Sequence, residues 1–281
     1  MSDTPHCYRH PDRETLVSCS ECGRPICEDC MTFAPVGIRC PDHASAGATK
    51  PAAARTVQNM RRTTRALAAP ATMALIAINA IIYMITATQG GGINFPGGKL
   101  FYDWVLQGYA VSNGDWWRLV TAMFLHGSLL HLLFNMFALF WLGTIVEQAL
   151  GTPKFLLVYF VSGLAGSAGA LWLSSAAAVT VGASGAIFGL IGALLILEYL
   201  ATGSLMGQAM VLILVNLALT FAIPGISIGG HLGGLAAGII ATFALLQYKA
   251  RAQPLIGVAV AVGVGIASVG LAYARVRGYA V

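Results

Sequence analysis

Long apolar runs separated by short polar or glycine-rich segments dominate this 281-residue chain from about residue 67 onward. A helix needs about 20 apolar residues to cross a bilayer. The pattern predicts seven such helices, over residues 67–88, 119–146, 155–174, 183–201, 208–224, 228–248 and 254–274. Turn-forming stretches such as QGGGINFPGG and GTPK separate them. We therefore expect an all-α polytopic membrane protein.

The composition agrees with this pattern. Hydrophobic residues make up 57% of the chain and charged residues 10%, whereas soluble domains carry about 25% charged residues. No charged residue lies between Lys154 and Glu198, or between Glu198 and Lys249. The first 65 residues are instead polar, hold all six cysteines and lack the apolar core of a signal peptide. We expect a small polar head without a signal peptide, followed by a large membrane body.

Basic residues concentrate just before the first apolar run. The chain has a net charge of +5, and residues 48–66 hold five basic and no acidic side chains. Such a cluster usually fixes membrane orientation and attracts anionic lipid, so we expect no nucleic-acid partner. The positive-inside rule then predicts a cytoplasmic N-terminus, with Lys154 and Lys249 on cytoplasmic loops. Arg275 and Arg277 fall outside as exceptions.

The polar head holds cysteine and histidine in pairs separated by two residues. The pairs are Cys7 and His10, Cys19 and Cys22, Cys27 and Cys30, and Cys40 and His43. One tight turn lets both members of a pair reach the same metal, and eight such ligands suffice for two tetrahedral zinc ions. Three disulfides are the alternative, but they leave both histidines unexplained and do not suit a reducing compartment. We therefore expect two structural zinc ions.

Polar residues inside the apolar runs need a reason, because they are costly in lipid. His131 and Asn135 are four residues apart and therefore share one helix face. The predicted topology puts both, together with Ser184 and His231, in the outer parts of their helices, whereas His126 falls at the start of its run. We expect Ser184, His131, Asn135 and His231 to share one depth that water reaches from outside.

Glycines spaced four residues apart predict close packing of the runs that carry Ser184 and His231. These glycines are Gly185, Gly189, Gly230, Gly234 and Gly238. Such faces let helices approach until a hydroxyl and an imidazole nitrogen are about 3 Å apart, as proton transfer requires. Taken alone, such a serine is usually only a small packing residue, and a membrane histidine as often forms a hydrogen bond to a neighbouring helix. The segment GASGA also lacks the second glycine of the nucleophile elbow of soluble hydrolases, and we expect no strand before it.

Together these motifs resemble the rhomboid family of intramembrane serine proteases. The resemblance covers about residues 67–250 and rests on the WR of the first external loop, HGSLLHLLFN, GASG and GHLGGLAAG, in that order. It implies a six-helix core with a catalytic dyad, in which Ser184 is the nucleophile and His231 the general base. It also implies an oxyanion hole made by the Ser184 backbone amide with the side chains of His131 and Asn135.

The resemblance also implies supporting roles for further residues. They are His126, Gly182, Gly185, Phe188, Trp117 and Arg118. His126 is expected to be structural or to organise water, and the two glycines flank the serine. Phe188 lies one turn after Ser184, where it can stack on the base but cannot hydrogen-bond to it. Trp117 and Arg118 belong to the external loop, where an interfacial aromatic belt is an equally good interpretation of the tryptophan.

The head resembles a B-box-type zinc finger, with all eight ligand positions occupied. In that family the pairs cross-brace. This implies one ion held by Cys7, His10, Cys27 and Cys30, and another held by Cys19, Cys22, Cys40 and His43. The resemblance implies a protein-interaction module, and so small a domain depends on its metal for stability.

We therefore predict four parts: a B-box-like double-zinc domain over 1–47, a basic linker over 48–66, the six-helix catalytic core over 67–250, and a seventh transmembrane helix with a tail over 251–281.

The predicted activity is hydrolysis of peptide bonds in or near substrate transmembrane helices, with no metal needed for catalysis. The expected partners are membrane protein substrates, the lipid bilayer and a protein that binds the zinc domain. Alternatives are an inactive relative that binds client helices, a zinc-finger membrane adaptor and a transporter. The predicted location is the plasma or inner membrane of a prokaryote, with the zinc domain cytoplasmic and the active site open to the outside.

Overall fold

The computed structural model describes residues 4–34, 37–44 and 69–279. The chain divides into two compact units, Met1–Arg65 and Ala66–Val281. The predicted linker 48–66 lies outside the described residues, so its basic cluster stays a sequence prediction. The predicted core and the predicted C-terminal helix both fall in the second unit.

The first unit is built from short elements around buried cysteines. Its regular elements are the 3-10 helix η1 (Glu28–Cys30), strands β1 (Thr32–Phe33) and β2 (Ile38–Arg39), and helix α1 (Pro41–Ala44). β1 and β2 pair antiparallel. Ile26 is fully buried, and the other buried apolar residues in the described part of this unit are cysteines. The apolar core of this unit is therefore small and consists largely of cysteine side chains.

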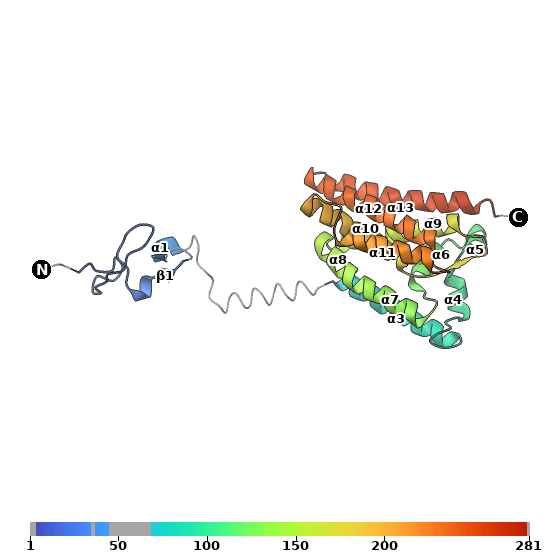
Figure 1. Ribbon diagram of the computed structural model, residues 1–281, viewed down its shortest axis with the longest axis horizontal. Helices are drawn as coiled ribbons and strands as arrows, with labels where there is room; N and C mark the ends of the chain where they lie inside the picture. Colours follow the sequence, from blue (N-terminus) through green and yellow to red (C-terminus); the bar gives the residue numbers. More distant parts are fainter. Residues whose placement is uncertain (1–3, 35–36, 45–68, 280–281) are drawn as a thin grey trace. The chain divides into compact units, whose positions relative to one another are not determined.

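The second unit is a helix bundle with one small two-stranded sheet. Its elements are α3 (Pro70–Gln89), α4 (Gly98–Trp104), β3 (Leu106–Gln107), α5 (Gly108–Ser112), α6 (Arg118–Thr121), η2 (Ala122–Phe124), α7 (Leu129–Ala138), η3 (Leu139–Gly143), α8 (Thr144–Leu150), α9 (Thr152–Leu173), β4 (Val179–Thr180), α10 (Ser184–Thr202), α11 (Gln208–Ala222), α12 (Ile228–Ala250) and α13 (Pro254–Val276). The turn η3 is π-helical and joins α7 to α8. The long helices lie side by side, and the short α4, α5 and α6 gather at one end of the bundle (Figure 1).

Six helices in the described part of the chain are long and apolar enough to cross a membrane. They are α3, the continuous helix Leu129–Leu150, α9, α10, α12 and α13. The predicted span 208–224 corresponds to α11, which has 15 residues. At 1.5 Å per residue such a helix is about 22 Å long, which is shorter than the roughly 30 Å of a bilayer core. A seventh spanning helix is therefore not confirmed, although the predicted C-terminal helix 254–274 is present as α13.

The predicted helix over 119–146 is wrong at its start. The short helices α6 and η2 form there instead, and the backbone becomes extended at Leu125, with φ −96° and ψ 149°. The long helix begins at Leu129, after Ser128. Ser128 is an N-cap, because its hydroxyl accepts a hydrogen bond from the backbone amide of His131. Hydropathy alone missed the break because the residues on both sides of it are apolar.

Glycines bring α10 and α12 into close contact, as their spacing predicts. A Cβ at Gly185 would lie 3.2 Å from the carbonyl oxygen of Gly230, and one at Gly234 would lie 2.7 Å from the carbonyl carbon of Gly185. Helix α9 is a third partner that the spacing did not single out, since a Cβ at Gly166 would lie 2.9 Å from the Gly230 oxygen. The backbones of these helices can approach this closely only because side chains are missing at the contacts.

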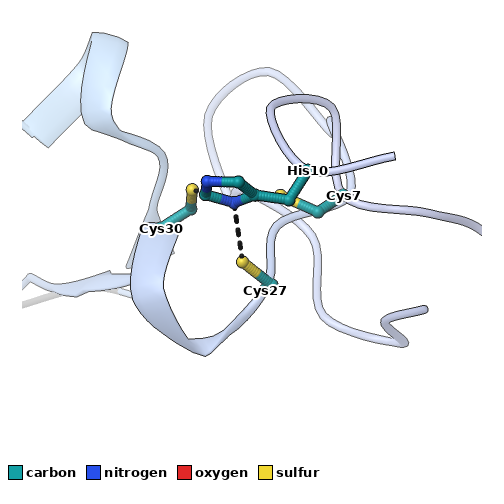
Figure 2. A group of neighbouring side chains, drawn as sticks. All are labelled: Cys7, His10, Cys27 and Cys30. Carbon is teal, nitrogen blue, oxygen red and sulfur yellow. Dashed lines mark hydrogen bonds between the residues drawn. The ribbon is translucent and has the colours of Figure 1, made fainter. Parts of the chain in front are cut away.

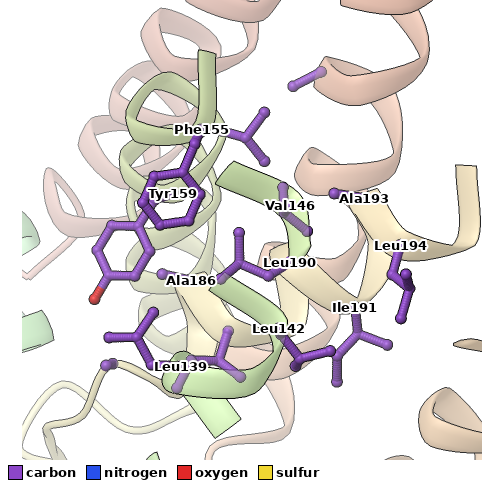
Figure 3. Close-up of a cluster of buried hydrophobic side chains, with 14 of the residues drawn as sticks. Leu139, Leu142, Val146, Phe155, Tyr159, Ala186, Leu190, Ile191, Ala193 and Leu194 are labelled. Carbon is purple, nitrogen blue, oxygen red and sulfur yellow. The ribbon is translucent and has the colours of Figure 1, made fainter. Parts of the chain in front are cut away.

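Larger apolar side chains pack against another part of α10. Figure 3 shows Leu190 of α10 among Leu139 and Leu142 of η3 and Phe155 of α9. Leu190, Leu139 and Phe155 are fully buried. Helix α10 is thus held by glycine contacts and by an apolar cluster, and both fix the position of its first residue, Ser184.

Two glutamates in the helical unit cap the N-termini of other helices. Glu147 of α8 is 3% exposed and accepts hydrogen bonds from the backbone amides of Ala71 (3.1 Å) and Thr72 (2.8 Å) at the start of α3. Glu198 of α10 accepts one from the Ala209 amide (3.0 Å) at the start of α11. Negative charge is favourable at a helix N-terminus, which explains how these carboxylates are tolerated in apolar helices.

Polar contacts attach the end of α13 to the end of α9. The Arg275 Nε donates to the Leu171 carbonyl oxygen (3.2 Å), and its guanidinium lies over the rings of Tyr279 (4.8 Å) and Trp172 (5.9 Å). A cation is favourable beside the last carbonyls of a helix and over an aromatic face. These contacts give Arg275, which the sequence analysis expects outside as an exception to the positive-inside rule, partners within the protein.

Candidate active site

Three helices place the predicted polar residues within their first turns. Ser184 is the first residue of α10, His231 the fourth of α12 and His131 the third of α7. At 1.5 Å per residue, all three lie within about 6 Å of a helix start. Ser128 and Ser227 begin α7 and α12 by accepting hydrogen bonds from backbone amides three residues on. Two local serine caps therefore determine where the histidine-bearing helices start.

Ser184 and His231 are in hydrogen-bond contact. Ser184 Oγ lies 2.9 Å from His231 Nε2, and the histidine is 7% exposed. The ring of Phe188 stacks on the imidazole, with centroids 3.9 Å apart and planes inclined by 18°. The distance between Oγ and Nε2 lies within the range required for proton transfer from the hydroxyl to the imidazole.

Thr220 of α11 contacts the other nitrogen of the same imidazole. Its Oγ1 lies 2.7 Å from His231 Nδ1, and Thr220 is 2% exposed. Sequence reasoning missed this residue. A threonine in an apolar helix commonly bonds its own backbone, and nothing in the local pattern distinguishes Thr220 from such a residue.

The turn before Ser184 is fixed by a short sheet and by a glycine. Strand β4 pairs antiparallel with β3, so the expectation that no strand precedes the serine is wrong. Gly182 has φ +125°, which favours glycine. A Cβ there would also lie 2.8 Å from His131 Nε2 and 3.8 Å from Ser184 Oγ. Gly182 is therefore required both by the turn and by the space beside the serine.

His131 presents its Nε2 to this space. The backbone amide of Gly127 donates to His131 Nδ1 at 3.4 Å. Since an amide can only donate, Nδ1 must accept, and a neutral imidazole then carries its hydrogen on Nε2. Asn135 lies one turn later, is 6% exposed, and donates its side-chain amide to the His131 carbonyl oxygen at 2.9 Å. The arrangement offers Nε2 as a hydrogen-bond donor next to Gly182 and Ser184.

His126 is fully buried beside His131. The two rings meet edge to face with centroids 5.0 Å apart. Within the described part of the chain, neither ring nitrogen of His126 has a hydrogen-bond partner. Its visible contact is the packing of its ring against the ring of His131.

Trp117 and Arg118 lie at the start of α6, and their side chains bond to the backbone at the end of α4 and just after it. Arg118 is 8% exposed, and its guanidinium donates to Asp115 Oδ2 (2.9 Å) and to the carbonyl oxygens of Tyr102 (2.7 Å) and Val105 (2.9 Å). Trp117 is 51% exposed, and its Nε1 donates to the carbonyl oxygen of residue 103. Their contacts are with this part of the chain rather than with the Ser184–His231 pair.

The eight predicted metal ligands form two clusters in the first unit. One contains Cys7, His10, Cys27 and Cys30 (Figure 2), and the other Cys19, Cys22, Cys40 and His43. Within each cluster the candidate ligand atoms lie within 4.8 Å of one another. The grouping is the one that the cross-braced arrangement implies. All six cysteines are free thiols, so the disulfide alternative is not supported.

The spacing of the ligand atoms fits a tetrahedral zinc ion. With bonds of about 2.3 Å to sulfur and 2.0–2.1 Å to nitrogen, the ligand atoms should be about 3.6–3.8 Å apart. His10 Nδ1 lies 3.3 Å from Cys27 Sγ and 3.4 Å from Cys30 Sγ. In the second cluster, Cys22 Sγ and Cys40 Sγ are 3.8 Å apart. Both groups of side chains can therefore hold a metal ion.

The environment of two thiols favours the thiolate form that binds metal. Burial raises the pKa of Cys7, but hydrogen bonds from the backbone of Cys27, Arg9 and His10 outweigh it and lower the pKa to about 6. Cys19 occupies the matching position in the second cluster, and its pKa is lowered to about 6 in the same way. The first cysteine of each cluster thus sits among backbone amides that stabilise negative charge.

The helical unit is similar in sequence to known proteins. The family model of the rhomboid domain matches residues 113–248. Rhomboid protease GluP of Bacillus subtilis (strain 168) is 36% identical over 188 residues, which cover 64% of this chain and 36% of GluP. YdcA of the same organism, which is also named for rhomboid proteases, is 35% identical over 189 residues, covering 65% of this chain and 92% of YdcA. RHOMBOID-like protein 5 of Arabidopsis thaliana is 39% identical over 145 residues, which cover 48% of this chain and 46% of that protein.

Proposed function

The chain belongs to the rhomboid family, and on that premise we propose that it is an intramembrane serine endopeptidase with Ser184 and His231 as its catalytic dyad. The observation that carries the proposal is the 2.9 Å contact between Ser184 Oγ and His231 Nε2 in a bundle of apolar helices. Similarity to named rhomboid proteases supports peptidase activity. The chain is an integral membrane protein by its family and its six long apolar helices.

In the proposed reaction, His231 Nε2 takes the hydroxyl proton as Ser184 Oγ bonds to the carbonyl carbon of the scissile peptide. The carbonyl electron pair moves to the oxygen and forms a tetrahedral oxyanion. The imidazolium then gives its proton to the amine nitrogen as the carbon–nitrogen bond breaks. Water, activated by the same imidazole, hydrolyses the acyl-enzyme and restores Ser184.

The proposed oxyanion hole consists of the Ser184 backbone amide with the side chains of His131 and Asn135. The bond from the Gly127 amide to His131 Nδ1 supports this role, because it leaves the hydrogen on Nε2. Gly182 leaves room for that nitrogen beside the serine. Each fixed donor aimed at a developing oxyanion is worth about 100-fold or more in rate.

The proposed substrates are transmembrane or juxtamembrane segments of other membrane proteins. The dyad lies at helix starts, and we propose that water and an unwound peptide approach it from that end of the bundle. Lys154 at the start of α9 and Lys249 at the end of α12 are basic residues at helix ends. By the positive-inside rule these ends face the cytoplasm, and we propose that the dyad opens to the external side of a prokaryotic plasma membrane.

For the first unit we propose a B-box-type module with two zinc ions, one in each cluster. The zinc would cross-link turns that have almost no apolar core of their own, so its role is structural. We propose that the module faces the cytoplasm and binds a protein partner, and that catalysis in the helical unit does not require it.

Cleavage by the reconstituted protein tests the proposed activity. The purified chain in proteoliposomes should cut a reporter with a transmembrane segment and should react with a fluorophosphonate, while Ser184→Ala and His231→Ala should do neither. Ser268→Ala is a matched control, because its hydroxyl is also buried in a membrane helix but bonds its own backbone. Equal labelling of the unaltered protein and Ser184→Ala would contradict the proposal.

A further inference from the structure

His231 has a second polar neighbour besides the serine. Its Nδ1 lies 2.7 Å from Thr220 Oγ1, and the same oxygen lies 2.7 Å from the carbonyl oxygen of Asn216. Both His231 and Thr220 are buried. Among the described residues, no other hydrogen-bond partner of Nδ1 is present.

The number of hydrogens available decides the direction of these bonds. A threonine hydroxyl has one hydrogen and a carbonyl has none. The hydrogen between the two oxygens must therefore come from Thr220, which donates to Asn216. The Thr220 oxygen can then only accept from the imidazole, so Nδ1 carries the hydrogen. The reverse arrangement would leave two oxygens 2.7 Å apart with no hydrogen between them.

A neutral imidazole has one N–H, so a hydrogen on Nδ1 leaves Nε2 with a free lone pair. Nε2 is the nitrogen that lies 2.9 Å from Ser184 Oγ, and it needs that lone pair to accept the serine proton. Phe188 fixes the plane of the ring by stacking, but a phenyl face does not distinguish the two nitrogens. Among the described contacts, Thr220 is the one that does.

We propose that Thr220 is a positioning residue that holds His231 in the tautomer with hydrogen on Nδ1, an inference that rests on the proposed peptidase function. When the serine proton moves to Nε2, the Nδ1–H of the imidazolium keeps donating its hydrogen bond to Thr220 Oγ1. The same bond then stabilises the cation until Nε2 passes its proton to the leaving amine. Thr220 thus occupies the position that a carboxylate takes in a Ser–His–Asp triad, without bringing a charge into the membrane.

The test combines a tautomer measurement with kinetics on three variants. Thr220→Val removes the hydroxyl at almost constant volume, and Thr220→Ser keeps it. Thr86→Val is the matched control, because Thr86 is equally buried in a membrane helix but its hydroxyl bonds its own helix backbone. Nitrogen-15 NMR of histidine-labelled protein at about pH 8, where an ordinary imidazole is neutral, reports the tautomer, and comparison with His231→Ala assigns the signal.

We expect the Nδ1–H tautomer in the unaltered protein, in Thr220→Ser and in Thr86→Val, and a mixture in Thr220→Val. The kcat for reporter cleavage should fall at least about tenfold in Thr220→Val, or about 1.4 kcal/mol, with KM unchanged, and should be retained in the other two variants. An Nε2–H tautomer in the unaltered protein would overturn the proposal, as would equal loss in Thr220→Ser and Thr220→Val. If the Nδ1–H tautomer depends on Thr220 but the unaltered protein cleaves nothing, the hydrogen bond stands and the peptidase function fails.

Discussion

Replacing Gly234 by alanine tests whether the close approach of α10 and α12 sets up the dyad. An alanine Cβ would lie 2.7 Å from the carbonyl carbon of Gly185, whereas nonbonded carbons prefer about 3.5–4.0 Å. The carbonyl oxygen of Gly185 would lie closer still to the added Cβ, so the helices must separate by at least about 1 Å at this contact. Ser184 precedes Gly185 and His231 lies one turn before Gly234, so their 2.9 Å contact would stretch to about 3.9 Å, beyond hydrogen-bond range.

A misplacement of about 1 Å costs about 100-fold in rate, and we expect Gly234→Ala to lower kcat/KM by at least that factor. The assays are cleavage of a transmembrane reporter in proteoliposomes and the rate at which a fluorophosphonate labels Ser184. Gly270→Ala is the matched control, because a Cβ at Gly270 of α13 would meet no atom within 4 Å. This control should retain the activity of the unaltered protein.

Two results would refute this reasoning. The first is a folded Gly234→Ala protein whose kcat/KM stays within about tenfold of the unaltered protein, or about 1.4 kcal/mol. The second is an equal loss in Gly270→Ala, which would mean that glycine matters for a reason other than the contact between α10 and α12. Thermal unfolding of each variant separates a displaced dyad from a protein that has not folded.

Three further predictions follow from individual contacts. Glu147→Gln removes the carboxylate that caps α3 and should lower the free energy of unfolding by about 1–3 kcal/mol; an unchanged thermal midpoint would contradict the capping role. Phe188→Leu removes the ring stacked on His231 and should lower kcat about two- to tenfold with KM unchanged in steady-state cleavage; an unaltered kcat would show that stacking is not needed. Cys27→Ser should reduce the metal content from two zinc ions to one per chain while reporter cleavage persists, and loss of both ions would show that the two clusters are not independent.

Sequence patterns alone predicted that Ser184, His131 and His231 lie at one depth in the membrane; the contact of His131 with the site was implied only by the family resemblance. Ser184 and His231 lie near the starts of their apolar runs and His131 in the outer half of its predicted run, and helices that run in the same direction through a membrane begin at the same side. Glycine spacing added that two of these helices approach closely, which the contact between Gly185 and Gly234 bears out geometrically. Helical periodicity and membrane thickness strongly constrain where a residue lies along a membrane helix, so the positions of a few polar residues were enough to predict a shared depth.

Other parts of the site depend on contacts that hydropathy does not record. The break before Leu129 is a short polar and glycine segment, residues 126–128, between two apolar stretches, and it depends on the Ser128 cap. Arg118 was expected to support the site from the external loop, and the hydropathy pattern does not show that its bonds to backbone carbonyls organise that loop. Thr220 resembles any threonine in an apolar helix until a second element brings His231 Nδ1 to its oxygen. Such pairings between distant segments arise only when the helices are packed.

The proposed site solves a problem that is specific to lipid surroundings. In water-soluble serine proteases, a buried carboxylate orients the histidine, but an added charge among apolar helices is costly. Here three helices orient the histidine without a carboxylate. Helix α12 carries His231, α10 stacks Phe188 on its ring, and α11 holds Nδ1 through Thr220. Because Thr220 also donates to the Asn216 carbonyl, its oxygen is polarised and becomes a better acceptor. On this reasoning the site is uncharged before the reaction, and charge appears only as the oxyanion beside His131 and the imidazolium beside Thr220, where donor and acceptor are already in place.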